Sequence, residues 1–261
     1  MRAPRSLSAL RRAPGERPWV LGHRGARHAA PENTLCAFEL SLAEGAEGVE
    51  LDVRLDGAGR AIVLHDAGLE RVTAGADGRN VRELSAAELA AVRVAGSEPV
   101  PLLADVFDWA RERAARVNVE LKSDVASLSE LVDAVVRDVR RAGALPELVF
   151  FSSFHPWLVR STAAALPAFC SCWLVHAKQQ AFRAASLFWS LGAVGVNPEH
   201  VLVTQARMTR WQHAGALVNT WTVNEPARAI ELSELGVDAI ISDTPGAIVK
   251  ALGRQSAGGA S

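Results

Sequence analysis

Cysteine is scarce in this chain, which holds three among its 261 residues: Cys36, Cys170 and Cys172. A low, odd number without regular spacing argues against a disulfide framework and favours reduced thiols in a cytoplasmic protein. Cys170 and Cys172 would share one face of a strand. Two cysteines spaced in this way are a poor metal site on their own, so we interpret both as small buried hydrophobic residues.

Long apolar runs and a large net charge are also missing. No segment approaches the roughly 20 apolar residues of a membrane-spanning helix, which argues against stable membrane insertion. The formal net charge is −1, so no overall basic field would recruit nucleic acid. Hydrophobic residues make up 49% of the chain, enough for a sizeable core. These features favour a globular protein with a small-molecule partner, and they leave the oligomeric state open.

The two ends of the chain differ in composition from the rest. Residues 1–18 carry five Arg against one Glu and have no apolar stretch of the kind found in export signals. We expect this arm to be flexible or loosely docked, and we expect a flexible tail at 255–261. Residues 19–254 contain no linker or low-complexity segment, so they should form one domain.

Within that domain, short apolar segments alternate with longer helical patterns. The segments predicted as strands are 19–23, 48–55, 117–121, 148–154, 169–175, 193–197, 217–223 and 238–242. The helices predicted after them start near 34, 102, 127, 156, 177, 204, 225 and 245. Repeated strand-then-helix units imply parallel strands with helices outside, and eight of them suggest a closed (β/α)8 barrel, the TIM barrel.

One region departs from this alternation. The turn "DGAG" leads the second strand into "AIVLH" at 61–65, which predicts a hairpin. Residues 66–101 are irregular, with a short helix expected at 85–92. This excursion would lie on the loop side of the second strand.

Reactive side chains gather where the predicted strands end. In a parallel barrel the catalytic groups cluster at the C-terminal ends of the strands, so this position is informative. The residues placed there are His23, Arg24, Glu50, Asp52, His65, Glu120, Lys122, Phe154 and Trp221. Because Glu50 and Asp52 are two residues apart, they point to one face of their strand, as do Glu120 and Lys122.

The three carboxylates of Glu50, Asp52 and Glu120 predict a cation site. A charge inside an apolar strand costs several kcal/mol unless it is paired or binds a metal. A set of oxygen ligands suits Mg²⁺ or Ca²⁺ better than Zn²⁺. Arg24 and Lys122 would add positive charge beside the cation and could bind a phosphate. Ordinary ion pairing could explain one such carboxylate, but it is a poor account of the whole set.

His23 and His65 have the right type for a general base and a general acid near neutral pH. Asp66 could orient His65 through a hydrogen bond. We interpret Asp243, which precedes a predicted helix, as a helix cap. Phe154 and Trp221 are either core aromatics or part of a substrate wall. The remaining histidines, at positions 28, 155, 176, 200 and 213, are assigned to loops and helix surfaces.

The sequence around these residues resembles a known family, the glycerophosphodiester phosphodiesterases. The matching segments are "HRGARHAAPENT" at 23–34, "GVELDVRLDGAGRAIVLHD" at 48–66, "VELKS" at 119–123, "SSFHP" at 152–156, "NTWTVNEP" at 219–226 and "GVDAIISDTPG" at 236–246. They cover nearly the whole chain from about residue 19, and the first two are highly specific as a pair. Residues 170–200 carry no sharp family signature.

The resemblance implies metal-dependent hydrolysis of glycerophosphodiesters to glycerol 3-phosphate and an alcohol. It implies a divalent metal, Mg²⁺ or Ca²⁺, on Glu50, Asp52 and Glu120. It also implies that His23 and His65 are the acid–base pair and that Arg24 and Lys122 contact the phosphate. Residues 66–101 would form a small cap over the site. Phe154 and Trp221 would lie near the glycerol or the leaving group, and Glu32 and Asn33 would hold the first loop.

Two other functions stay open from the sequence. A phosphodiesterase of the lysophospholipase D type would use the same core on lysophospholipids, but it needs an apolar channel. A barrel that has lost catalysis could serve as a phosphate-ligand binding module, although such a protein should lack a histidine or a metal carboxylate. The sequence does not decide whether water or the neighbouring glycerol hydroxyl attacks the phosphorus, or which histidine is the base.

Overall fold

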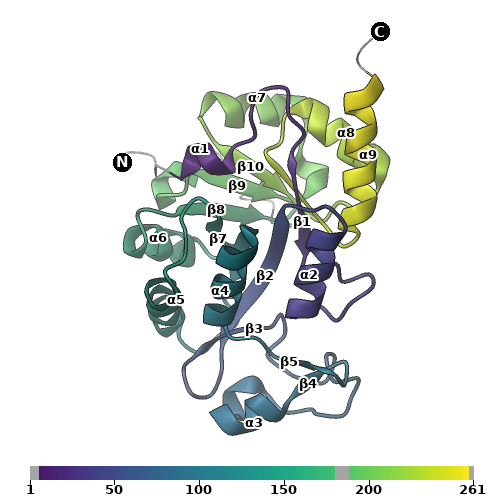
Figure 1. Cartoon of the computed structure of the whole chain (residues 1–261). Helices are drawn as coiled ribbons and strands as arrows, with labels where there is room; N and C mark the ends of the chain where they lie inside the picture. The colour runs from purple at the N-terminus through teal and green to yellow at the C-terminus, as the bar shows by residue number, and fades with distance from the viewer. Residues whose placement is uncertain (1–5, 180–187, 259–261) are drawn as a thin grey trace.

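Eight parallel strands form a closed barrel (Figure 1). The structure, a computed structural model, describes residues 6–179 and 188–258. The barrel closes because β1 pairs with both its neighbours, β2 and β11. Its strands are β1 (Trp19–His23), β2 (Gly48–Leu55), β6 (Arg116–Leu121), β7 (Val149–Ser153), β8 (Cys170–Val175), β9 (Gly195–Pro198), β10 (Leu217–Thr220) and β11 (Ala239–Ser242). The predicted TIM barrel is therefore confirmed.

Helices surround the barrel and connect its strands. They are α2 (Leu35–Ala43), α4 (Leu103–Arg113), α5 (Leu128–Ala142), α6 (Pro156–Ala165), α7 (Gln205–His213), α8 (Pro226–Leu235) and α9 (Pro245–Gly258), with short 3₁₀ turns η3 (Phe188–Leu191) and η4 (His200–Leu202). Most of the helix predicted at 177–190 lies outside the described residues. None of the described helices is both long and apolar enough to span a bilayer.

The alternation along each strand separates two environments. On β2, Val49, Leu51 and Val53 belong to the apolar layer beneath the helices. Glu50 and Asp52, between them, point the other way, toward the barrel interior. The N-terminal half of that interior is apolar and contains Cys170 and Cys172, both buried as free thiols in agreement with their interpretation as core residues. Glu50, Asp52 and Glu120 are not part of this apolar cluster.

Part of the arginine-rich arm contacts the bottom of the barrel. Helix α1 (Leu7–Leu10) brings Leu10 into the interior apolar cluster, where it is 3% exposed. The hydroxyl of Ser6 donates to the Ala168 carbonyl at 2.8 Å. The indole of Trp19 donates to the Leu10 carbonyl at 3.2 Å. Ser6 and Leu10 therefore attach this part of the arm to the bottom of the barrel.

Residues 66–101 form a small unit that follows β3 (Ala61–Val63), the antiparallel partner of β2. The unit contains η1 (Val81–Glu83), α3 (Ala86–Ala91), β4 (Arg93–Val94) and β5 (Glu98–Pro99), and it projects from one end of the barrel in Figure 1. Its buried apolar residues form a cluster of their own with Ile62 and Leu64. We call residues 66–101 the cap. At the other end of the chain, α9 extends into the segment 255–261 that was expected to be a flexible tail.

Candidate active site

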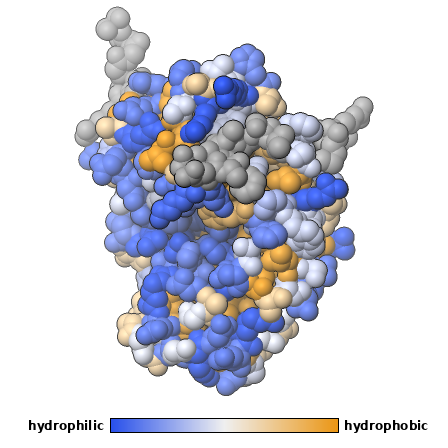
Figure 2. All heavy atoms as spheres, turned by 180° about the vertical axis from the view of Figure 1, so that it is seen from behind, coloured by the Kyte–Doolittle hydropathy of each residue, from blue (hydrophilic) through white to orange (hydrophobic). Residues whose placement is uncertain are grey.

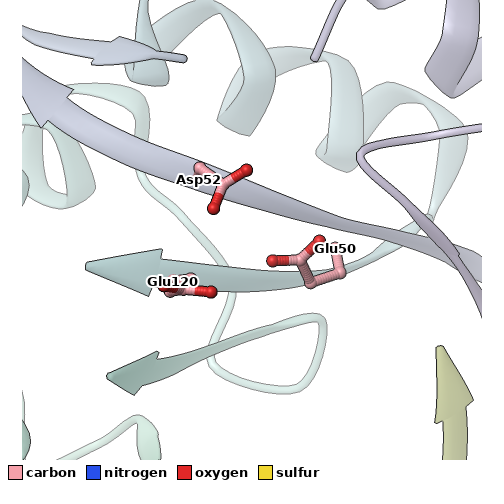
Figure 3. A group of neighbouring side chains, drawn as sticks. All are labelled: Glu50, Asp52 and Glu120. Carbon is pink, nitrogen blue, oxygen red and sulfur yellow. The ribbon is translucent and has the colours of Figure 1, made fainter. Parts of the chain in front are cut away.

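The three predicted carboxylates meet inside the barrel. Strand register pairs Asp52 with Glu120 across β2 and β6, and Glu50 lies two residues before Asp52 on the same face. Figure 3 shows the three side chains around a common space. One carboxylate oxygen from each lies within 4.8 Å of the others; Glu50 and Asp52 are buried, and the Glu120 side chain is 12% exposed. The arrangement has the all-oxygen chemistry that suits a divalent cation such as Mg²⁺ or Ca²⁺.

The electrostatics of this cluster also fit a cation. Burial and the nearby charges of Asp52 and Glu120 raise the pKa of Glu50 well above its usual range. Burial and Asp52 raise the pKa of Glu120 to about 7. Burial alone would raise the pKa of Asp52, but Lys122 and Arg24 lower it to about 2. Ionising all three carboxylates together would thus place more negative charge here than the neighbouring cations neutralise, and a divalent cation would relieve this repulsion.

Two cationic side chains lie beside the carboxylates. The Nε atom of Arg24 is 3.1 Å from Asp52 Oδ2, and its Nη1 donates to Glu32 at 2.9 Å. The Lys122 ammonium lies 3.0 Å from Glu120 and 3.3 Å from Asp52. Arg24 adopts a left-handed conformation with φ of 57°, which turns the chain sharply at the end of β1. Both cations line the cavity above the carboxylates, where an anionic group could bind.

His23 is held by an aspartate from the last strand of the barrel. Its Nδ1 lies 2.6 Å from Asp243 Oδ1. Because a carboxylate only accepts hydrogen bonds, Nδ1 carries the proton and Nε2 is left free on the side of Glu50, 3.9 Å away. Asn224 donates to the other Asp243 oxygen at 2.8 Å. The interpretation of Asp243 as a helix cap is therefore wrong: its carboxylate binds a histidine instead.

His65 has an aspartate of its own, which is the next residue in the chain. Its Nδ1 lies 2.6 Å from Asp66 Oδ1, as the sequence analysis suggested. Arg71 of the cap pairs with Asp66 and with Glu32, at 2.8 Å from the latter. Burial lowers the pKa of His65, and the positive charges of Lys122 and Arg24 lower it further against the opposing effect of Asp52.

A cavity of about 140 Å³ connects these groups. His23, Arg24, Glu50, His65, Glu120 and Lys122 line it on one side, and Phe154, Leu174, Trp221 and Ile241 on the other. The rings of Phe154 and Trp221 meet edge to face, with centroids 5.5 Å apart, and the Trp221 indole donates to the Asn197 carbonyl at 2.8 Å. The aromatic pair is thus fixed as a wall. A second hollow of about 220 Å³ adjoins the cavity at His65 and Lys122 and reaches Ser123 and Asp124.

All nine predicted site residues except Asp52 line this cavity, and Asp52 lies directly behind it between Arg24 and Lys122. Two polar neighbours were not predicted as part of the site, although Asn33 was expected to hold the first loop. Asn33 donates to Asp52 at 3.1 Å, and Asn118 lines the cavity floor. Asn118 lies two residues before Glu120 on the same strand, and this spacing was the signal available for predicting Asn118. No local pattern connected Asp243 with His23, which lies 220 positions away.

Comparisons with known proteins agree with this geometry. The model of the glycerophosphoryl diester phosphodiesterase family matches residues 23–247. The chain belongs to this family. The resemblance inferred from the motifs and the predicted class of enzyme are thereby confirmed.

Individual relatives cover nearly the whole chain. The glycerophosphodiester phosphodiesterase of Caldanaerobacter subterraneus is 27% identical over 88% of this chain and 96% of its own length. The probable glycerophosphodiester phosphodiesterase 1 of Mycobacterium tuberculosis is 30% identical, over 88% of this chain and 90% of its own. Both alignments therefore span most of this chain and nearly all of each relative.

Solved structures show the same fold. A crystal structure from Silicibacter pomeroyi, described as a putative glycerophosphoryl diester phosphodiesterase, has a TM-score of 0.83 and 27% identity, covering 96% of this chain and 97% of its own. An Oleispira antarctica phosphodiesterase, solved with the product sn-glycerol-3-phosphate, has a TM-score of 0.81 and 28% identity, with 91% and 97% covered.

Proposed function

We propose that this protein hydrolyses glycerophosphodiesters to glycerol 3-phosphate and an alcohol, using a divalent cation, Mg²⁺ or Ca²⁺, held by Glu50, Asp52 and Glu120. The observation that carries the proposal is one cavity lined by two oriented histidines, two cationic side chains and carboxylates that could hold a metal. The Oleispira antarctica relative binds sn-glycerol-3-phosphate, which supports the same product here. The reaction would take place in the cytoplasm, as the cysteine content suggests.

The cation, when bound, would supply positive charge that polarises a phosphoryl oxygen. Arg24 and Lys122 hold the phosphate oxygens and stabilise the charge that develops on them. One histidine removes the proton from the attacking oxygen through Nε2, and the other protonates the departing alkoxide. Asp243 and Asp66 keep the two rings in the tautomer that this exchange requires.

The walls of the cavity suit the organic parts of the substrate. Phe154 and Trp221 present apolar surface to the carbon atoms of the glycerol or of the leaving group. The family resemblance favours attack by the neighbouring glycerol hydroxyl, through a cyclic phosphate, over direct attack by water. Detection of a transient cyclic phosphate by ³¹P NMR would distinguish these routes.

The test is release of glycerol 3-phosphate from glycerophosphocholine and glycerophosphoethanolamine, with Mg²⁺, with Ca²⁺ and with EDTA. Release that depends on the metal supports the proposal, and the ranking of the two substrates identifies the preferred head group. Release that is unchanged in EDTA contradicts the cation site. No release with either metal contradicts the proposed activity.

The two alternatives predict different results in the same assay. A lysophospholipase D would act on lysophospholipids, yet the cavity is small for an acyl chain, and the face in Figure 2 is mostly hydrophilic with separate apolar patches. A binding module would retain glycerol 3-phosphate without turnover. No catalytic residue expected from the family motifs is missing in this chain, which favours the hydrolase.

A further inference from the structure

A buried amide without a hydrogen-bond partner lies beside the carboxylate cluster. Asn118 on β6 is 1% exposed and lines the same cavity as Glu50 and Glu120. Neither its Nδ2 nor its Oδ1 has a hydrogen-bond partner in the part of the chain that the structure describes. Burying an amide in this state costs free energy, and native proteins rarely retain one without a function for it.

The strand register identifies the group that can use this amide. Asn118 is the direct partner of Glu50 across β6 and β2, and Glu120 follows it by two residues on the same face. The Glu50 carboxylate accepts a hydrogen bond from the backbone N–H of Arg24 at 3.2 Å and lies 3.9 Å from His23. A carboxylate has about four lone-pair positions, so Glu50 retains acceptor capacity for a further N–H.

A pair of buried amides on the opposite side of the barrel provides a contrast. Asn219 on β10 donates through Nδ2 to Asn197 Oδ1 on β9, at 3.0 Å. Both residues are at most 1% exposed, like Asn118. These two side chains have each other as partners and do not line the catalytic cavity, whereas Asn118 has its free amide next to a predicted cation ligand. Asn197 Nδ2 also lacks a partner in the described part of the chain, but of these three amides only Asn118 has both its nitrogen and its oxygen unpaired there.

We infer that Asn118 is a positioning residue for the cation site, whose Nδ2–H donates to the Glu50 carboxylate when a divalent cation is bound. This inference rests on the cation site of the proposed function. With one Glu50 oxygen directed to the cation, the other is left to the amide, and the hydrogen bond fixes the orientation of the ligand. Residues that orient metal ligands in this way typically contribute 10- to 100-fold to metal affinity.

The test compares Asn118→Leu and Asn118→Ala with Asn197→Ala, a matched control on the opposite side of the barrel. Calorimetric titration with Mg²⁺ or Ca²⁺, without substrate, measures the dissociation constant of the cation. We expect it to rise about 10- to 100-fold in both Asn118 variants and to stay within about twofold of the wild type in Asn197→Ala.

Urea unfolding of the EDTA-treated proteins provides a readout that a purely structural residue would not give. Leu is similar in size to Asn and removes the unpaired amide, so the midpoint of Asn118→Leu should equal or exceed that of the wild type. Asn197→Ala should lower the midpoint, because it breaks the bond with Asn219. Asn118→Leu should thus keep its stability while losing cation affinity.

Wild-type cation affinity in Asn118→Leu would overturn the inference, as would an equal loss of affinity in Asn197→Ala. If the wild type hydrolyses its substrate with a metal and Asn118→Leu binds that metal normally, only the function of Asn118 is refuted. If the wild-type protein binds neither cation, the cation site of the proposed function fails, and this inference fails with it.

Discussion

The two histidines of the site are held by aspartates in different ways. His23 ends a barrel strand and is paired with Asp243 at the end of β11, which Asn224 also holds. His65 follows the hairpin and is paired with its neighbour Asp66, which Arg71 of the cap holds. The first pair therefore depends on closure of the barrel, and the second depends on the cap. Each site histidine is thus paired with an aspartate. In one pair the two residues are far apart in the sequence, and in the other they are adjacent.

The difference in exposure matches this difference in construction. The His23 side chain is 17% exposed, whereas the His65 side chain is 30% exposed. His65 also lies where the catalytic cavity meets the second hollow, while His23 faces the carboxylates from inside the barrel. Because different residues hold the two histidines, the histidines can act on different oxygens of one phosphodiester. A variant that changes the residues holding one histidine should not affect the other.

Apart from the histidines themselves, the largest effect should come from the carboxylates proposed to hold the cation. Glu50→Gln removes a charged ligand, so the metal concentration for half-maximal activity should rise by at least about tenfold, with a large loss of activity at low metal. A metal titration of glycerol 3-phosphate release measures this. Metal dependence identical to that of the wild type would exclude Glu50 as a ligand.

Smaller effects should separate the two aspartates. Asp243→Asn should lower turnover by about 10- to 100-fold, because the amide can hold His23 in the wrong tautomer. Asp66→Asn should lower turnover less, by about tenfold, because the pair is more exposed to water. NMR of the imidazole nitrogens would show the tautomer change at the affected ring. Equal losses in both variants would contradict the proposed difference between the pairs.

Acid should affect the Asp243 pair in a defined range of pH. Burial alone would raise the pKa of Asp243, but hydrogen bonds from His23 and Asn224 lower it to about 2. In an unfolded chain the pKa of an Asp carboxyl group is about 3.9. The stabilisation of the folded state by the Asp243 pair is therefore complete above that pH and is lost as the pH falls toward 2. The difference in free energy of unfolding between wild type and Asp243→Asn should therefore shrink from pH 5 to pH 2, as urea titrations can show. A constant difference would contradict this assignment.

The smallest expected effect comes from a variant that tests how far the cap holds His65 in place. Leu89 on α3 is 3% exposed within the cap's own apolar cluster. Leu89→Ala should destabilise the cap by about 2–5 kcal/mol and raise amide hydrogen exchange across 66–101, while exchange in β1 and β11 stays unchanged. Activity should fall only a few fold, through Asp66 and Arg71. Faster exchange throughout the barrel would show that the cap and the barrel unfold as one unit.

The sequence predicts the barrel well because its strand and helix patterns are local. It also predicts Glu50, Asp52 and Glu120 as a group, since charges in apolar strands with a spacing of two residues point to one interior. The pairing of Asp243 with His23 was missed because nothing local identifies the partner of a residue at the end of another strand. The contact made by Leu10 is not local either, because the apolar bottom of the barrel provides its partners.

The central claim is that His23 and His65 divide the acid and base work at one phosphate. The most direct measurement compares His23→Ala and His65→Ala on glycerophosphocholine and on a glycerophosphodiester with a p-nitrophenol leaving group, which needs no protonation to depart. Each variant should lose about 10²- to 10⁴-fold activity on glycerophosphocholine, and only the one that lacks the acid should recover on the p-nitrophenyl substrate. Near-normal turnover of glycerophosphocholine by either folded variant would contradict the two-histidine account.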